Sequence, residues 1–216
     1  MTSVLIVAGE SSGDRHAAGL VRAFKALDPS VGFFGAGGPA LAEAGVEILV
    51  PIQALSLVGV AEVLTSLPRV KRLFDGLVAE SEARRPAAAV LVDAPDFNLR
   101  LAKALKKRGI PVLYYISPTV WAWRRGRLKT IKANVDKMLL IFPFEREIYR
   151  KAGIPAVYVG HPLVERLPTS IDRAAFARTH GLDPSRPTIA LLPGSRRSEI
   201  CNHMPVLAGA ALRLRD

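Results

Sequence analysis

The sequence predicts an α/β fold built on a doubly wound, mainly parallel, Rossmann-like sheet. Short apolar runs recur along the chain, and longer helix-compatible segments separate most of them. Runs of this length are typical of strands buried on both faces, and their alternation with helices favours parallel pairing. The runs occupy 4–8, 46–50, 88–92, 111–116, 138–142, 156–159 and 188–192. Helices are expected over 13–27, 59–83, 96–108, 144–152 and 197–214.

The chain is expected to hold three segments. Residues 1–163 carry the strands and helices of a complete Rossmann-like domain, and residues 164–186 are more polar, which is typical of a linker with one short helix. Residues 187–216 then read as a strand, a Gly-Ser turn and a helix. Because one strand and one helix cannot bury their apolar faces alone, we expect the start of a truncated second domain. The alternative is that this pair packs onto the first sheet.

Composition and charge indicate a globular protein that binds an anionic partner. Half of the 216 residues are apolar, which is ample for one core, and the formal net charge is +11. This charge indicates an anionic partner: a nucleic acid, a phosphorylated substrate or an anionic membrane surface. The single cysteine fits a reducing compartment. With no signal peptide expected, and with Gln53 and Glu62 interrupting the apolar stretch 52–64, we expect a cytoplasmic protein without a membrane span.

A basic run at 123–132, "WRRGRLKTIK", follows closely after Trp121 and begins with Trp123. Tryptophans beside cations are typical of surfaces that stack on bases and of surfaces that lie at a bilayer interface. An ordinary solvated helix face with one buried tryptophan fits the same pattern. The charge alone does not choose among these three interpretations.

Polar side chains follow the first apolar run, where a parallel sheet usually binds its ligands. The loop lacks the G-x-G-x-x-G pattern of a dinucleotide site, and its carboxylates would repel phosphate. Carboxylates and hydroxyls suit the OH and NH groups of a sugar. Capping of the following helix is the alternative for Ser11, Ser12 and Asp14, but it leaves Glu10 unexplained. The predicted sugar-binding residues are Glu10, Ser11, Ser12, Gly13 and Asp14.

The run at 88–92 is followed by two aspartates that straddle a turn. Pro95 disfavours helix at Ala94, so Asp96 is a natural N-cap for the next helix. Asp93 has no such local role. A partly desolvated carboxylate at a strand end suits a general base, so Asp93 is the candidate for one.

Further candidates lie after later apolar runs. Ser117, Trp121, Trp123 and His161 are placed at the same edge of the sheet, although a lone histidine in a loop is more often structural than catalytic. The loop "LLPGSRRSE" has no carboxylate before its helix and is the better diphosphate site. Its candidate residues are Gly194, Ser195, Arg196 and Arg197.

Taken together, these stretches resemble lipid-A-disaccharide synthases, glycosyltransferases of the two-domain GT-B type. The resemblance runs from residue 8 to residue 200, and the family has a whole second domain where this chain has only its opening. Most of the uridine-nucleotide pocket that the family implies is therefore expected to lie outside these 216 residues. The matching motifs are "AGESSGD", "FFGAGGP", "LVGVAEVL", "DAPDFNLRLAK", "YYISPTVWAWRRGR", "FPFE", "VGHPL" and "LLPGSRRSEI".

The resemblance implies transfer of 2,3-diacylglucosamine from its UDP conjugate to 2,3-diacylglucosamine 1-phosphate, forming a β-1,6 disaccharide and UDP. Inversion in one displacement requires one base and positive charge on the leaving diphosphate. By this resemblance Asp93 is the base, Arg196 stabilises the leaving group, and Asp96 and Asn98 join the substrate-binding residues. No cofactor and no metal ion are expected, and the 216 residues alone are expected to be inactive.

Because both substrates carry acyl chains, we expect peripheral association with the inner face of the cytoplasmic membrane. Residues 59–78 place apolar side chains near helical spacing beside cations, which fits an interfacial helix and also an amphipathic core helix. The candidates for membrane contact are Val63, Leu64, Leu67 and Val70. No nucleic acid partner is expected, and the full-length protein could form a homodimer. Two rival hypotheses are a nucleic-acid-binding module and a transferase or epimerase acting on a soluble UDP-sugar.

Overall fold

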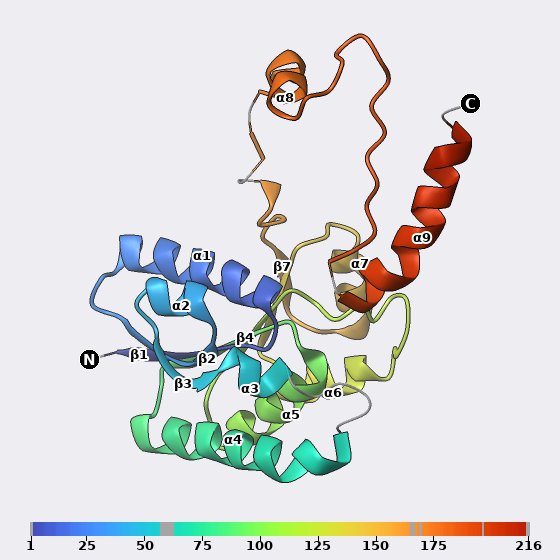
Figure 1. The fold of residues 1–216 in the computed structure, drawn as a ribbon. Helices are drawn as coiled ribbons and strands as arrows, with labels where there is room; N and C mark the ends of the chain where they lie inside the picture. Colours follow the sequence, from blue (N-terminus) through green and yellow to red (C-terminus); the bar gives the residue numbers. More distant parts are fainter. Residues whose placement is uncertain (1, 57–62, 165–166, 169, 196, 215–216) are drawn as a thin grey trace. The chain divides into compact units, whose positions relative to one another are not determined.

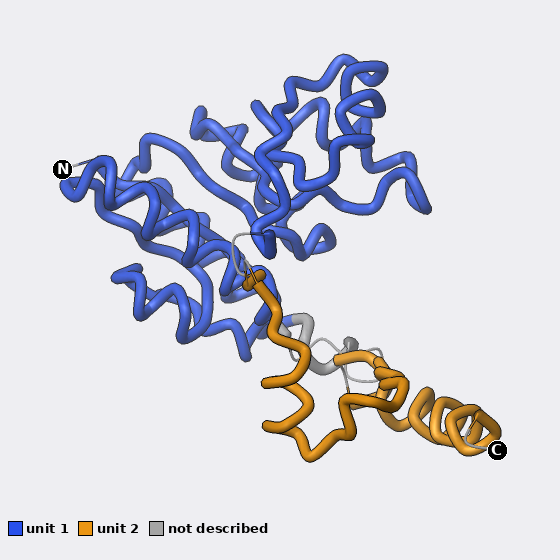
Figure 2. The backbone as a smooth tube through the Cα atoms, turned by 90° about the horizontal axis from the view of Figure 1, so that it is seen from above, with its two compact units in different colours: residues 1–166 blue, residues 167–216 orange. Residues whose placement is uncertain are grey.

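A computed structural model describes residues 2–56, 63–164, 167–168, 170–195 and 197–214. The chain divides into two compact units, residues 1–166 and residues 167–216, which are coloured separately in Figure 2. None of the described helices is long and apolar enough to cross a bilayer.

The first unit is built on a seven-stranded sheet in the order β3-β2-β1-β4-β5-β6-β7. Every strand pairing in it is parallel. The chain runs outward from β1 to β3 and then returns to continue from β4 on the other side, so the switch point lies between β1 and β4. The strands are β1 (Ser3–Ala8), β2 (Gly32–Gly37), β3 (Glu47–Pro51), β4 (Ala88–Val92), β5 (Val112–Tyr115), β6 (Lys137–Leu140) and β7 (Ala156–Tyr158).

Helices cover both faces of this sheet, as a doubly wound fold requires (Figure 1). α1 (Ser11–Leu27) and α2 (Pro39–Glu43) pack on one face through Ala17, Val21 and Leu41. The helices of the other face contribute Leu77, Leu101, Ile131 and Tyr149 to a second apolar layer. They are α4 (Val63–Arg84), α5 (Pro95–Lys106), α6 (Arg127–Asn134) and α7 (Glu145–Ala152), with the short α3 (Ile52–Ser56) beside them. The predicted fold class is therefore confirmed.

One strand of the sheet was not predicted. β2 has the sequence GFFGAG, and three glycines in six residues weaken any strand pattern. Gly35 has φ +149°, and a Cβ there would lie 2.0 Å from the carbonyl oxygen of Ile6 on β1. Glycine is thus required at this position because the two backbones approach too closely for a side chain.

The second unit contains α8 (Arg173–Thr179) and α9 (Arg197–Leu214). α8 is the short helix expected between 164 and 186, and the side chain of Asp172 caps it by accepting a hydrogen bond from the Ala175 amide at 2.9 Å. The strand predicted over 188–192 does not form, and Ile189 and Leu192 are exposed. A strand needs a hydrogen-bonded neighbour, and among the described residues this segment has none. The assignment of 187–216 to a second domain stays a prediction.

Candidate active site at the carboxyl edge of the sheet

The loops that follow β1, β4, β5, β6 and β7 meet at the carboxyl edge of the sheet, where open α/β folds bind ligands. The loops after β1 and β4 touch at the switch point itself. A Cβ built on Gly9 would lie 2.4 Å from the Cβ of Ala94. Gly9 therefore lets the two loops approach as closely as backbone allows, and the predicted sugar loop lies directly against the turn that carries Asp93.

Asp93 directly follows β4 and has an unusual backbone conformation. It has φ +50° and its neighbour Ala94 has φ +44°, so two successive non-glycine residues are left-handed. Each such residue costs on the order of 1–3 kcal/mol and persists only where its surroundings hold it. Here the Asp93 carbonyl accepts hydrogen bonds from the Tyr114 hydroxyl at 2.6 Å and from Nδ2 of Asn98 at 2.8 Å. The Asp93 amide also donates to the Tyr115 carbonyl at 3.1 Å.

Asn98 is fully buried beneath this turn. Its Nδ2 donates to the carbonyl of Val92 at 3.1 Å as well as to that of Asp93, and its Oδ1 has no hydrogen-bond partner among the described residues. The side chain therefore holds the strand-to-helix turn together. The structure gives Asn98 a positioning role, which differs from the expected direct contact with substrate.

Asp96 does not cap α5 as expected. The N-cap of α5 is Ala94, Pro95 follows it, and no side chain caps the helix. Instead Asp96 is exposed and its Oδ1 accepts hydrogen bonds from Arg124 at 3.0 Å and from Arg127 at 2.5 Å. The N-cap of α5 lies two residues before the predicted position. The carboxylate of Asp96 is therefore not used for capping, and it connects α5 to Arg124 in the loop after β5 and to Arg127 at the start of α6.

The loop after β1 divides into two parts. Glu10 is the N-cap of α1 without a side-chain capping bond, and Ser11 and Ser12 are exposed. Gly13 is buried against Val92. The exposed part therefore presents a carboxylate and two hydroxyls at the edge of the sheet.

Asp14 has a different role from the one expected. It is 3% exposed, and its carboxylate accepts hydrogen bonds from the amides of Gly38 at 2.7 Å, Ala40 at 3.0 Å and Leu41 at 3.3 Å. These amides belong to the first turn of α2, where unpaired N–H groups need an acceptor. Asp14 caps α2, not its own helix, and both carboxylate oxygens are already used.

Ser117 lies in a buried polar cluster with α7. Its Oγ donates to the Pro118 carbonyl at 2.9 Å and lies 2.6 Å from the hydroxyl of Tyr149. Glu145 is 1% exposed, and its Oε2 has no hydrogen-bond partner among the described residues. Burial raises the pKa of Glu145 above its ordinary value and raises the pKa of Tyr149 to about 12. Ser117 thus joins the loop after β5 to α7, and this structural use differs from the expected contact with substrate.

Five rings form a row along the carboxyl edge. Trp121 meets Phe144 edge-to-face at 5.4 Å between centroids, Phe144 stacks on Phe142 at 5.5 Å, and Phe142 contacts His161 at 5.5 Å. His161 in turn lies 6.5 Å from His16 on α1. Sequence reasoning had selected Trp121 and His161 but missed the other three rings. The "FPF" directly after a strand end was the signal that could have found two of them.

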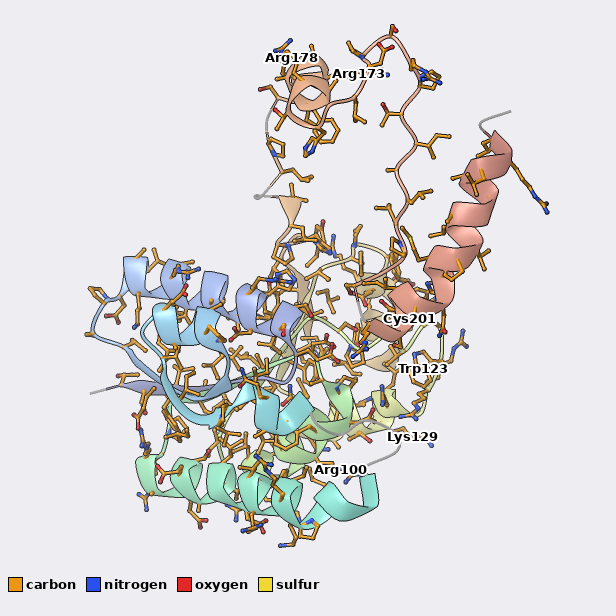
Figure 3. The ribbon with its side chains drawn as sticks, in the orientation of Figure 1. Arg100, Trp123, Lys129, Arg173, Arg178 and Cys201 are labelled. Carbon is orange, nitrogen blue, oxygen red and sulfur yellow. The ribbon has the colours of Figure 1, made fainter. Side chains whose placement is uncertain are left out.

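Trp123 lies outside this row, on the outer side of the loop after β5 (Figure 3). Its Nε1 donates to Oγ1 of Thr119 at 3.0 Å, and the guanidinium carbons of Arg124 and Arg127 lie 4.5 Å and 5.6 Å from its ring centroid. Two cations that also bind Asp96 therefore lie against this indole, which is still 52% exposed. The tryptophan and the arginines thus contact one another between the loop and α6, and a role of Trp123 in binding substrate stays a prediction.

The predicted diphosphate loop belongs to the second unit. The Ser195 amide donates a hydrogen bond of 2.9 Å to Oε2 of Glu199, so this amide already has a carboxylate as its acceptor. His203 Nδ1 lies 2.9 Å from the carbonyl of Pro193 and fastens the same loop to α9, whose first residue is Arg197. Gly194 has φ +110°, in the left-handed region. Arg196 lies outside the described residues.

The predicted membrane-contacting residues are only partly described. The side chains of Val63, Leu64 and Leu67 lie outside the described residues, and Val70 is half-buried. Further along α4, Phe74 packs against the core and meets Phe97 edge-to-face at 5.8 Å. This later part of the stretch is an amphipathic core helix, which leaves an interfacial role only for its start.

Comparison with known proteins relates the chain to one family. Residues 4–216 match the family described as Lipid-A-disaccharide synthetase. The lipid-A-disaccharide synthase of Myxococcus xanthus is 52% identical over 211 residues, which cover 98% of this chain and 55% of the relative. That of Geobacter sulfurreducens is 47% identical over 213 residues, which cover 99% and 56%. The chain spans about half the length of these curated relatives.

Solved structures share the fold at low sequence identity. A UDP-GlcNAc 2-epimerase from Neisseria meningitidis bound to UDP-GlcNAc matches with a TM-score of 0.55 and 9% identity, covering 76% of this chain and 47% of that one. A ugt transferase from Siraitia grosvenorii in complex with UDP matches with a TM-score of 0.51 and 11% identity, covering 83% and 55%. These similarities concern the fold alone.

Proposed function

The chain belongs to the lipid-A-disaccharide synthase family, and on that premise we propose that the whole protein transfers 2,3-diacylglucosamine from its UDP conjugate to 2,3-diacylglucosamine 1-phosphate. The products are a β-1,6 disaccharide and UDP. The observation that carries this proposal is the position of Asp93, whose strained turn is held by Tyr114 and Asn98 beside the sugar-loop residue Gly9.

The reaction is a single displacement that inverts the anomeric carbon. The Asp93 carboxylate takes the proton of the acceptor's 6-hydroxyl while that oxygen forms a bond to the anomeric carbon of the donor. The bond from this carbon to the diphosphate oxygen breaks, and its electron pair leaves with UDP. A left-handed turn fixed by three hydrogen bonds to the Asp93 backbone, two of them from side chains, supports this assignment, because a general base acts only when its position is held.

The sugar contacts are assigned to the exposed part of the loop after β1. Glu10, Ser11 and Ser12 offer acceptors and donors that match sugar hydroxyls, and they begin directly after Gly9. Asp14 serves the same loop indirectly by anchoring α1 to α2. In this proposal the carboxylates of the loop after β1 do not have to bind phosphate, because the diphosphate of the donor is assigned to another loop.

The departing diphosphate is assigned to the loop of Gly194, Ser195, Arg196 and Arg197. Positive charge there would stabilise the negative charge that develops on the leaving group. The carboxylate of Glu199 now accepts from the Ser195 amide, so a phosphate oxygen would take the place of that carboxylate. Arg196 is the proposed leaving-group stabiliser.

Membrane association is part of the proposal because both substrates carry acyl chains. Arg69, Lys71 and Arg72 are exposed on the early part of α4, next to the predicted apolar contacts. Cations near an anionic leaflet contribute about 1 kcal/mol each to surface binding. We therefore place the enzyme in the cytoplasm, at the inner face of the cytoplasmic membrane.

The test is a turnover assay of the full-length enzyme with two donor and acceptor pairs and with one donor alone. UDP release is measured with both substrates diacylated, with both substrates lacking acyl chains, and with UDP-N-acetylglucosamine alone. Release that requires both acylated substrates, together with formation of the disaccharide, supports the proposal. Equal turnover of the non-acylated pair, or epimerisation of UDP-N-acetylglucosamine, would instead favour an enzyme of soluble UDP-sugars.

A further inference from the structure

An apolar groove of about 450 Å³ lies on the first unit, beside the aromatic row. It is formed by the loop after β5, the first turn of α6 and the outer face of α7. This volume falls within the range of about 300–1,000 Å³ that is usual for small-molecule sites. The apolar lining residues are Val120, Trp121, Leu128, Ile148 and Ala152.

The walls of the groove are fastened to each other beneath its floor. The hydroxyls of Ser117, at the start of the loop, and Tyr149, on α7, lie 2.6 Å apart and are both buried. Val120 is 1% exposed, so it anchors the middle of the loop in the core. Because loop and helix are tied by a buried hydrogen bond and by packing, the groove exists before any ligand binds.

The aromatic row connects the groove to the candidate active site. Trp121 lines the groove and is also the first ring of the row that continues through Phe144 and Phe142 to His161. Trp121 is 42% exposed and Phe144 is 50% exposed. Single exposed apolar side chains are common on protein surfaces, whereas a contiguous apolar surface of this kind is typical of a binding site. The row ends at His16, within two turns of Glu10 on the same loop and helix.

Two cations give the groove a charge preference. Arg125 and Lys151 line it together with the apolar residues. Among the described residues Arg125 has no carboxylate within ion-pair distance, and Lys151 reaches only Glu147, at 3.5 Å, which Arg150 also binds at 2.7 Å. An apolar channel flanked by incompletely neutralised cations is complementary to an anionic amphiphile.

We propose that this groove binds one acyl chain of the acceptor, 2,3-diacylglucosamine 1-phosphate. This inference rests on the proposed function. The sugar lies at the carboxyl edge near Asp93, the chain follows the aromatic row, and its end lies between Trp121 and Ile148. The cations favour the anionic acceptor over neutral lipids through charge. The groove thus selects the acceptor by its acyl chain, at a distance from the reacting hydroxyl.

The experiment fills the groove without removing any core side chain. In the full-length enzyme, Ala152→Phe adds an aromatic ring inside the groove, and Trp121→Ser removes the ring that joins groove and row. Ala26→Phe, on the exposed end of α1, is the matched control for added bulk. KM and kcat are measured with the long-chain acceptor and with an acceptor whose chains are shortened to acetyl groups.

Both groove variants should raise KM for the long-chain acceptor by about 10-fold and leave kcat nearly unchanged, because the lost contact is made equally in ground and transition states. With the acetylated acceptor, Ala152→Phe and the Ala26→Phe control should match the unaltered enzyme. An unchanged KM for the long-chain acceptor in both groove variants overturns the inference. An equal rise with both acceptors overturns it too, because the defect would then not depend on the chain.

A direct binding measurement separates this inference from the proposed function. Equilibrium dialysis with radiolabelled 2,3-diacylglucosamine 1-phosphate should show weaker binding to Ala152→Phe than to the Ala26→Phe control, even in an enzyme preparation without turnover. If the unaltered enzyme shows no turnover but Ala152→Phe still binds the acceptor more weakly than Ala26→Phe does, only the proposed function is contradicted. If Ala152→Phe instead loses binding to phosphatidylglycerol vesicles and retains acceptor binding, the groove holds a bilayer lipid and the inference is wrong.

Discussion

The hydroxyl of Tyr114 donates a hydrogen bond of 2.6 Å to the carbonyl oxygen of Asp93. Tyr114 is fully buried on β5, and burial raises its pKa well above the ordinary value, so the hydroxyl keeps its proton and remains a donor. The neighbouring strand therefore fixes the backbone of the candidate base from below. This arrangement leaves the carboxylate of Asp93 at the edge of the sheet without requiring the side chain to hold the turn.

The first prediction concerns that carboxylate. In the full-length enzyme Asp93→Asn should lower kcat by about 100-fold or more, because an amide cannot accept the acceptor's proton. The fold should be retained, since the interactions that hold the turn are made by the Asp93 backbone. Steady-state turnover and thermal unfolding are compared with those of the unaltered enzyme. Near-normal turnover of the folded variant would remove Asp93 from this role.

The second prediction separates the two carboxylates of the loop after β1. Asp14→Ala should lower the free energy of unfolding by about 1–3 kcal/mol, because three amides at the N-terminus of α2 lose their acceptor. Glu10→Gln should leave the unfolding free energy nearly unchanged and should raise KM for a sugar substrate. Urea denaturation and steady-state kinetics measure the two effects. A reversed pattern, with stability lost at Glu10 and KM changed at Asp14 alone, contradicts the assignment.

The third prediction concerns pH and the buried Glu145. Because burial raises its folded-state pKa above the ordinary 4.5, the folded state holds its proton more tightly than the unfolded state. Stability from this group is thus fully present below the ordinary pKa and is lost as pH rises through the folded-state value. Glu145→Gln, which stays neutral, should lose less stability than the unaltered protein between about pH 4 and about pH 7 in urea titrations.

Glu147 on the same helix is the matched control for this titration. Its pKa is lowered to about 2 by the hydrogen bond from Arg150, so its contribution has the opposite sign and is lost as pH falls toward that value. Because that loss begins below the ordinary pKa of 4.5, Glu147→Gln should change the difference between about pH 4 and about pH 7 in the opposite direction to Glu145→Gln. If both variants change this difference equally, the effect does not arise from the burial of Glu145.

The fourth prediction concerns the membrane. The 216-residue chain should sediment with liposomes, more strongly as the anionic lipid content rises and less strongly with added salt. Changing Val63, Leu64 and Leu67 together to Ser should weaken this binding without unfolding the protein. Tight binding to single-stranded RNA without liposome binding would favour the nucleic-acid hypothesis instead.

Sequence reasoning predicted the sheet well because its strands are apolar runs between helices. It missed β2, where Gly35 is required by contact with β1 and so follows no local pattern. It wrongly predicted a strand over 188–192, where apolar residues have no described neighbour to pair with. Pairing is a property of two segments, and a pattern in one segment does not reveal it.

The sequence predicted where the candidate site lies better than it predicted the contacts of its residues. Parallel topology brings every strand-end loop to one edge, so the region of Glu10, Asp93 and His161 followed from the order of elements. The partners of Asp14, Asn98 and Ser117 did not follow. Asp14 and Ser117 are held by groups that only the fold brings near, as with Ser117 and Tyr149, 32 residues apart in the chain. Asn98 bonds to nearby carbonyls, which the unusual shape of the turn places within its reach. Polar residues at strand ends are thus divided between chemistry and support by tertiary packing.

The contact between Gly9 and Ala94 constrains how this site can vary during evolution. The two positions share space for a single methyl group, since a second one would lie 2.4 Å from the first. An alanine at position 9 should therefore be tolerated only together with a glycine at position 94, a residue that would also accept the left-handed backbone there without strain. The residues at positions 9 and 94 should therefore change together, and homologous sequences should show their sizes covarying.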